Sequence, residues 1–119
     1  MGVSITELEK AFTALKAALA APKNDISRDA TIQRFEFVVE LAWKTSRKVM
    51  GTQTAAPKDV IREMARNDLI SNPEIWFEAL EMRNLSSHTY NESQAETVYS
   101  FAGSFVFAAD QLIVKLKSK

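Results

Sequence analysis

Two long stretches, residues 27–50 and 92–117, repeat their apolar residues at the three- and four-residue spacing of an α-helix. This pattern limits the fold more than any other feature of the chain. At about 100° per residue the apolar side chains form one broad arc on each stretch, as expected for a helix with one face in a core. No segment alternates apolar and polar residues for long enough to predict a strand. The sequence therefore predicts an all-α fold.

Three shorter helices are expected at residues 4–20, 57–68 and 73–87. Ser4 and Glu7 have the spacing of a capping box, and Pro57 and Pro73 stand where a first-turn proline costs least. A chain of 119 residues can bury a core as one domain, covering 1–119. We expect an antiparallel four-helix bundle with an additional short helix. Its expected core includes Phe35, Trp43, Leu80, Phe101 and Phe105.

Some apolar residues on the two long helices fall outside these core arcs. Phe37 and Leu41 lie beyond the polar stripe of the first, and Val106 and Ile113 lie off the arc of the second. Such a surplus favours a twofold homodimer, with these four residues in its interface. The alternative is that Phe37 and Leu41 are ordinary exposed apolar residues, which monomers tolerate.

The charge balance and the cysteine count exclude several classes of protein. Fifteen basic residues match fifteen acidic ones, so no overall field draws the protein to nucleic acid or to an anionic membrane. The chain has no cysteine and one histidine, and we expect neither a metal nor another cofactor. No continuous apolar run reaches the roughly 18 residues that a membrane span needs. We expect a cytoplasmic protein without a membrane segment.

The residues with most capacity for chemistry are concentrated between Met82 and Glu92. This stretch holds the one histidine, His88, together with Arg83 and Tyr90. Histidine exchanges a proton near neutral pH, and arginine binds phosphate through a planar pair of donors. Metal-free RNA cleavage needs a base for the ribose 2′-OH, a cation for the charge on phosphorus and an acid for the leaving oxygen. Arg83 and His88 could supply parts of such a site.

Helix geometry limits what these two residues can do within one chain. Residues five apart on a helix point roughly 140° from each other, and one histidine does not easily serve as both acid and base. A symmetric dimer would bring two arginines and two histidines to one cleft. The alternative is structural: a lone histidine near a helix end is usually a cap, and a nearby arginine usually meets a carboxylate of a helix.

The chain contains four segments with a familiar combination of motifs: RFEFVVELAWK at 34–44, PKDVIRE at 57–63, EIW at 74–76 and RNLSSHTY at 83–90. Together they resemble the nucleotidyltransferase substrate-binding protein family, a branch of the HEPN superfamily. The likeness covers nearly the whole chain. It implies a small, usually dimeric helical bundle, encoded beside a minimal nucleotidyltransferase with which it forms a complex. The bundle resembles the C-terminal domain of kanamycin nucleotidyltransferase.

Many HEPN relatives are instead metal-independent ribonucleases that use an Arg-x4-6-His motif at the dimer cleft. On that pattern the resemblance implies that Arg83 grips the scissile phosphate and that His88 transfers protons. Tyr90 would receive AMP from the partner, which silences the nuclease. Asn84 would lie beside the cleft. Glu36 or Glu40 would orient Arg83.

Two hypotheses follow from this resemblance. In the first, the chain is a non-catalytic partner of a minimal nucleotidyltransferase and shapes a nucleotide or acceptor site in the complex. In the second, it is a metal-independent ribonuclease toxin that acts on RNA as a homodimer. The partner nucleotidyltransferase would neutralise the toxin by AMPylation of Tyr90. We favour the first, because it requires no catalysis by the chain itself.

Overall fold

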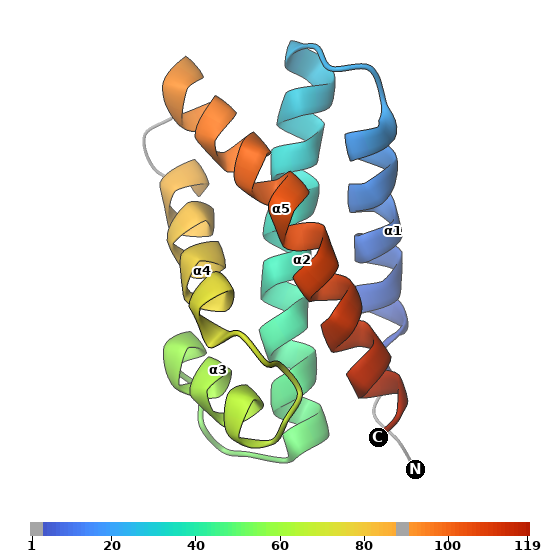
Figure 1. Ribbon diagram of the computed structural model, residues 1–119, viewed down its shortest axis with the longest axis vertical. Coiled ribbons are helices and arrows are strands. Elements are labelled where there is room, and N and C mark those ends of the chain that lie inside the picture. Colours follow the sequence, from blue (N-terminus) through green and yellow to red (C-terminus); the bar gives the residue numbers. More distant parts are fainter. Residues whose placement is uncertain (1–3, 88–90) are drawn as a thin grey trace.

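The computed structural model describes residues 4–87 and 91–119, and the described residues form five helices and no strand. Helices α1 (Thr6–Ala20), α2 (Asp25–Met50), α4 (Pro73–Ser87) and α5 (Glu92–Lys117) run alternately up and down (Figure 1). The short α3 (Pro57–Arg66) lies across the end of the bundle where α2 finishes. The predicted antiparallel four-helix bundle with an additional short helix is confirmed.

Helix α2 is the centre of the bundle, since it packs against each of the other four helices. At 1.5 Å per residue its 26 residues span about 39 Å, nearly the whole 42 Å length of the molecule. Its core face carries Phe35, whose ring meets the edges of Phe101 at 5.8 Å and Phe105 at 5.5 Å between ring centroids. Trp76 of α4 meets Phe105 from the other side at 4.8 Å. These aromatic pairs join α2, α4 and α5.

Of the five residues predicted to lie in the core, three are buried and two are only partly buried. Phe35, Leu80 and Phe105 are buried, whereas Trp43 and Phe101 are half-buried at the margin of the core. Trp43 lies at the edge of the buried arc of α2, next to the exposed Lys44, whose Nζ stands 5.7 Å from the indole ring. A large ring at that position packs against the core with part of its surface in solvent.

The helix starts differ from the prediction because local hydrogen bonds compete. Ser4 Oγ accepts from the N–H of Thr6 at 3.3 Å, so it is used in a turn and the predicted capping box with Glu7 does not form. α1 therefore begins at Thr6. The next helix begins at Asp25, two residues before the predicted start at 27, and Asn24 is its cap. The Asn24 side chain accepts from the Ser27 N–H at 2.8 Å and the Ser27 hydroxyl accepts from the Asn24 N–H at 2.9 Å.

The helix ends show where the chain must turn. Gly51 adopts the left-handed conformation with φ 67°, which glycine accommodates readily, and closes α2. α3 ends at Arg66, two residues before the predicted end at 68. Asp68 has φ 59°, which is outside the helical region, and the Leu69 N–H donates back to the Met64 carbonyl at 2.9 Å. This turn buries Leu69 and leads into α4.

The apolar surplus on the long helices is smaller than the sequence indicated. Ile113, predicted at a dimer interface, is buried. It lies one helical turn before Lys117, whose Nζ is 2.8 Å from Glu9 of α1, so this side of α5 faces α1. Leu41 and Val106 are half-buried against the core, and Phe37 alone of the four is an exposed side chain.

Among the described helices, α5 is long and apolar enough to cross a membrane by length and composition. The core helix of a soluble bundle passes the same test, so this is weak support for a span. In the structure α5 packs against α1, α2 and α4.

Candidate functional site

The last turns of α4, which carry Arg83 and Ser86, pack against the first half of α2. Two glutamates of α2 meet them. Because α2 and α4 are antiparallel, Glu40 lies opposite Arg83 while Glu36, one turn earlier, lies opposite Ser86. The two carboxylates that the sequence associated with Arg83 are therefore both next to this end of α4.

Arg83 forms a close ion pair with Glu40. Its Nε lies 2.5 Å from Glu40 Oε1, and both side chains are partly accessible, at 34% and 25%. The Nε–H bond does not point along this line, and Nε has no hydrogen bond among the described residues. Lys44, one turn along α2, also approaches Glu40, at 3.3 Å. The Glu40 carboxylate thus lies near two cationic side chains. The Arg83 guanidinium still has N–H groups with which it can donate hydrogen bonds to another partner.

Ser86 ties α4 to Glu36. Its hydroxyl lies 2.6 Å from Glu36 Oε2, to which it donates, and 2.9 Å from the Arg83 carbonyl. Sequence reasoning did not single out this serine. The sequence feature that could have identified it is its spacing of three residues from Arg83, which on a helix directs both side chains toward the same neighbouring helix.

An open hollow lies between α2 and this end of α4, and we call it the α2 hollow. Its volume is about 370 Å³, and the residues that line it are Asp29, Ala30, Ile32, Gln33, Glu36 and Ser86. Ile32 is buried beneath it, while Asp29 and Gln33 are exposed at its rim. The α2 hollow thus combines an apolar base with hydroxyl, amide and carboxylate groups, a combination that suits a small polar ligand.

Arg28 fixes the start of α5, which follows directly on residues 88–90. The side chain is buried, and its Nη1 lies 2.8 Å from Glu92 and 3.2 Å from Glu96. Hydrogen bonding to Glu92, and then to Glu96, raises the pKa of Arg28 above its ordinary value. The pKa of Glu96 is lowered, first by a hydrogen bond from Lys23 and then by one from Arg28. Sequence reasoning missed this cluster, because its cations and its carboxylates are more than sixty residues apart in the sequence.

The structure describes part of the predicted site. Arg83, Glu36 and Glu40 are brought together, and Asn84 is exposed beside them. His88 and Tyr90 lie outside the described residues, so the predicted proton transfer and modification remain predictions. The described segment ends at Ser87 and resumes at Asn91, whose side chain accepts from the Gln94 N–H at 2.9 Å and caps α5. Both flanks of the histidine segment are therefore attached to α2, through Ser86 and Arg83 before it and through Glu92 after it.

Comparison with protein families gives one match over almost the whole chain. A sequence model of the family described as "nucleotidyltransferase substrate binding protein like" matches residues 3–118. Among curated proteins, the chain is similar to one from Haemophilus influenzae named "Probable ribonuclease HepT", with 31% identity over 96 residues. The aligned part covers 74% of this chain and 66% of that protein, so the chain spans just under two thirds of its relative.

Two solved structures are similar along nearly their full length. A protein from Thermus thermophilus has 30% identity and a TM-score of 0.82, covering 92% of this chain and 98% of that one. A Haemophilus influenzae protein has 28% identity and a TM-score of 0.84, covering 96% and 99%. Its structure is described as revealing the fold of a substrate binding domain of a nucleotidyltransferase. The five-helix fold is therefore one already seen in this family.

Proposed function

This chain belongs to the nucleotidyltransferase substrate binding protein-like family, and we propose that it is the helical partner subunit of a minimal nucleotidyltransferase encoded nearby. In the complex it shapes a nucleotide or acceptor site. The fold it shares with a nucleotidyltransferase substrate-binding domain supports this role. The nucleotidyltransferase supplies the transfer chemistry, and this chain supplies positioned binding groups.

The observation that carries the proposal is the α2 hollow next to Arg83. Gln33 and Ser86 offer hydrogen bonds to hydroxyl or amine groups of an acceptor, and Glu36 accepts from them. Arg83, partly exposed one turn away on α4, offers a planar pair of donors to a phosphate. The ion pair with Glu40 holds the guanidinium in place before the ligand arrives, which reduces the entropy lost on binding.

We further propose that the chain forms a homodimer through a stripe of α2, the α2 stripe, that carries the exposed Phe37 and the half-buried Leu41. Phe37 is 45% exposed, a large fraction for a phenylalanine in the middle of a helix. Charged residues of both signs border this stripe, including Arg34, Lys44 and Glu40, so two copies can meet without strong repulsion. A dimer of this kind would bring two Arg83 side chains toward a shared cleft.

The second candidate function is that of a metal-independent ribonuclease toxin. It is favoured by the similarity to a protein named as a probable ribonuclease, together with the Arg-x4-His spacing of Arg83 and His88. In this case His88 transfers protons at the ribose 2′-OH and Arg83 stabilises the charge on the phosphate. AMP on Tyr90 would repel the RNA backbone through its negative phosphate.

One set of variants separates the two functions. If the chain is a substrate-binding subunit, Gln33→Leu raises the KM of the co-expressed nucleotidyltransferase for its acceptor, and the wild-type chain cleaves no RNA. The matched control is Gln53→Leu, which changes an exposed glutamine in the connection between α2 and α3. Unchanged kinetics for Gln33→Leu would contradict the acceptor site at the α2 hollow.

If the chain is a nuclease, Arg83→Ala and His88→Ala each abolish RNA cleavage and toxicity, and a chelator has no effect. Incubation with the nucleotidyltransferase and ATP then adds the mass of AMP to the wild type but not to Tyr90→Phe. RNA cleavage that survives His88→Ala would rule out the catalytic assignment.

A further inference from the structure

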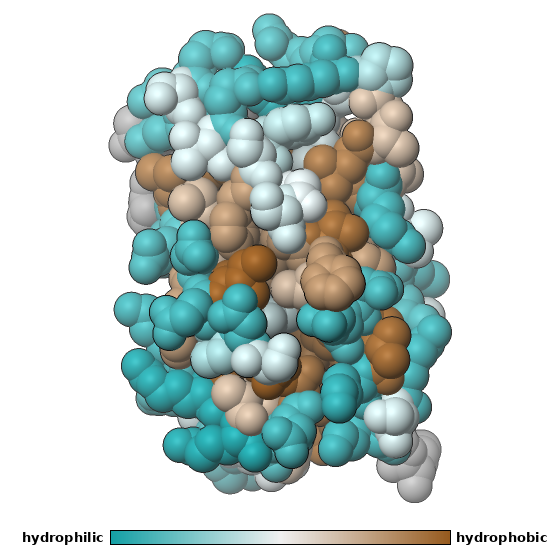
Figure 2. Space-filling view, viewed as in Figure 1, coloured by the Kyte–Doolittle hydropathy of each residue, from teal (hydrophilic) through white to brown (hydrophobic). Residues whose placement is uncertain are grey.

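The outward face of α5 carries large apolar side chains that nothing in the described structure covers. Phe107 is 70% exposed and Val114, two turns later on the same side of the helix, is 59% exposed. Between Glu96 and Asp110 the helix has no charged residue. Figure 2 shows apolar side chains gathered over the middle of this face, with hydrophilic side chains around them. Large apolar side chains exposed on one side of a helix are typical of an interaction site.

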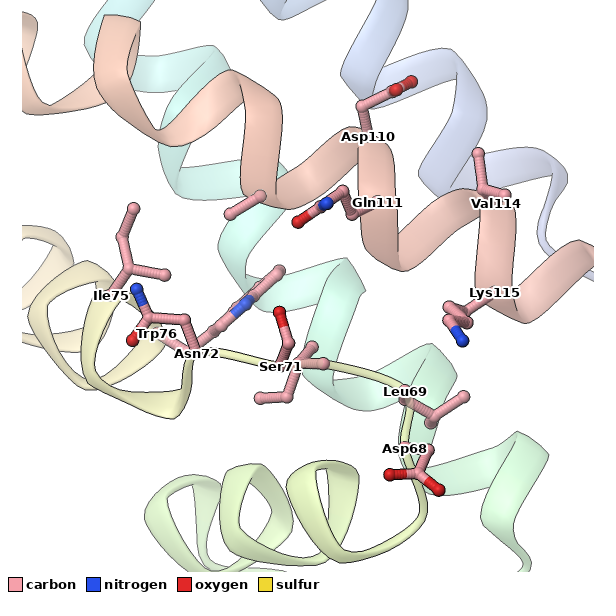
Figure 3. Close-up of a pocket in the computed structure, with 12 residues that line it drawn as sticks. Asp68, Leu69, Ser71, Asn72, Ile75, Trp76, Asp110, Gln111, Val114 and Lys115 are labelled. Carbon is pink, nitrogen blue, oxygen red and sulfur yellow. The ribbon is translucent and has the colours of Figure 1, made fainter.

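A groove runs beside this face, between α5 and the connection from α3 to α4, and we call it the α5 groove (Figure 3). Its volume is about 450 Å³. The apolar residues that line it are Leu69, Ile70, Ile75, Trp76, Ala108 and Val114. Gln111 of α5 and Ser71 of the connection point into it from opposite sides, and neither side chain has a hydrogen bond among the described residues. The α5 groove is therefore large enough to take an apolar side chain and has polar groups free to orient it.

The surroundings of the α5 groove are acidic. Asp68 and Asp110 line it, and the exposed Glu74 and Glu78 stand on α4 on either side of Ile75 in the sequence. Lys115 is the one cation in the groove lining. Two carboxylates and one ammonium line the groove, and Glu74 and Glu78 add two carboxylates on α4 next to Ile75. This excess of acidic groups favours a partner surface with basic residues around an apolar one.

We propose that this face, formed by Phe107, Val114 and the α5 groove, docks the nucleotidyltransferase through an apolar side chain flanked by lysine or arginine. The inference rests on the proposed function and adds to it the place and chemistry of the contact. Phe107 and Val114 pack against the partner, its apolar anchor enters the α5 groove, and its cations meet Asp68, Glu74, Glu78 and Asp110. The α2 stripe, on the opposite side of the core from α5, stays available for a second copy of the chain.

The acidic residues around the α5 groove favour the nucleotidyltransferase over two other possible partners, a second copy of the chain and an anionic membrane. A twofold contact between two copies would bring the same acidic groups toward each other, and like charges brought together across an interface weaken it. An anionic membrane surface would be repelled by the same four carboxylates. A basic protein partner gains from both the apolar and the acidic parts of the face.

The test measures affinity between this chain and the nucleotidyltransferase encoded beside it, by isothermal titration at two salt concentrations. Phe107→Asp and Ala108→Trp, the second of which fills the α5 groove, should each weaken binding by about tenfold or more. The double charge reversal Glu74→Lys with Glu78→Lys should weaken binding most at low salt. Ile26→Asp, at an exposed apolar side chain in the first turn of α2, is the matched control and should bind the nucleotidyltransferase normally. Circular dichroism checks that each variant keeps its helical content.

The outcomes are distinct. Failure of the wild-type chain to bind the nucleotidyltransferase would contradict the proposed function and the inference with it. Normal binding by both Phe107→Asp and Ala108→Trp would overturn the inference alone. Loss of the chain's self-association in Phe107→Asp, measured by sedimentation, would show a second copy on this face. Binding of the chain to anionic vesicles that Phe107→Asp abolishes would show a membrane there. Either result would also overturn the inference.

Discussion

At the level of single residues, the contacts of Glu40 determine how much stability the protein loses when Arg83 is replaced. Glu40 faces Arg83 at 2.5 Å and Lys44 at 3.3 Å, so removal of the arginine leaves the carboxylate with one cation. Both members of the Arg83 pair are partly exposed, and pairs of this kind contribute little net stability.

We therefore expect Arg83→Ala to lower the free energy of unfolding by about 1 kcal/mol at most. Urea titration followed by circular dichroism measures this. Glu40→Gln serves as the control, since it removes the carboxylate that both cations share. A loss of several kcal/mol in Arg83→Ala would mean that the arginine is mainly structural, and a loss of activity could then not be assigned to the site.

Phe105 and Phe107 allow a direct comparison of alanine substitution at a buried and at an exposed position of the same helix. They are two residues apart on α5, but Phe105 is fully buried against Phe35 and Trp76, whereas Phe107 is 70% exposed. Phe105→Ala should destabilise the fold by about 3–5 kcal/mol, because it leaves a cavity between three helices. Phe107→Ala should change stability by less than about 0.5 kcal/mol. Similar losses for the two variants in thermal melts would contradict the placement of α5.

At the scale of the helices, buried Arg28 joins the first turns of α2 and α5. Its contacts to Glu92 and Glu96 hold the start of α5 where the chain comes from the histidine segment. A buried guanidinium left without these carboxylates would be costly. We therefore expect the cluster to set the orientation of α5 relative to α2 as well as to add stability.

The lowered pKa of Glu96 makes a pH dependence testable. Hydrogen bonds from Lys23 and Arg28 hold this pKa below the ordinary 4.5 in the folded state. A depressed carboxylate pKa contributes stability above 4.5, and that contribution is lost as the pH falls through the folded-state value. The urea midpoint of Glu96→Gln should thus be lower at pH 7 and should fall less between pH 5 and pH 3 than that of the wild type.

Glu81→Gln is the control for this measurement, because Glu81 is an exposed carboxylate on α4 that makes no ion pair among the described residues. If Glu96→Gln and Glu81→Gln lose stability in parallel with the wild type as the pH falls, Glu96 does not stabilise the native state.

Sequence reasoning located the helices well because their signals are local. The ranges 73–87 and 92–117 match α4 and α5, and the predicted end of α2 at residue 50 is also right. The predicted capping box at Ser4 does not form, because the Ser4 hydroxyl accepts from the Thr6 N–H. The start of α2 at Asp25 was missed by two residues, since Asn24 caps the helix. Apolar periodicity identified the main buried face of each helix. It could not predict how many further residues are buried where a second helix packs against the same helix.

Ile113 and the candidate site show the limits of this approach. Ile113 lay off the main apolar arc, and only the packing of α5 on α1 explains its burial. For the site, the motif identified Arg83 and pointed to Glu36 and Glu40, but the pairing of Ser86 with Glu36 depends on the register of two helices fifty residues apart. The α2 hollow and the α5 groove arise from three-dimensional packing and had no sequence signal of their own.

At the scale of the whole molecule, the bundle presents two faces with different chemistry. The α2 and α4 side combines Arg83, Lys44 and Phe37 with the α2 hollow, and it is the proposed place for a ligand and for a second copy. The α5 side is apolar with an acidic border, and it is the proposed place for the nucleotidyltransferase. A partner subunit needs such a separation, because it must bind one protein and keep a site open.

Native mass spectrometry of the chain co-expressed with its proposed nucleotidyltransferase partner tests whether the two proteins form a complex. We predict a single assembly whose mass accounts for both proteins, with this chain present in two copies. The two proteins appearing only as separate species, when each is folded and both are mixed at micromolar concentration, would contradict the proposed complex.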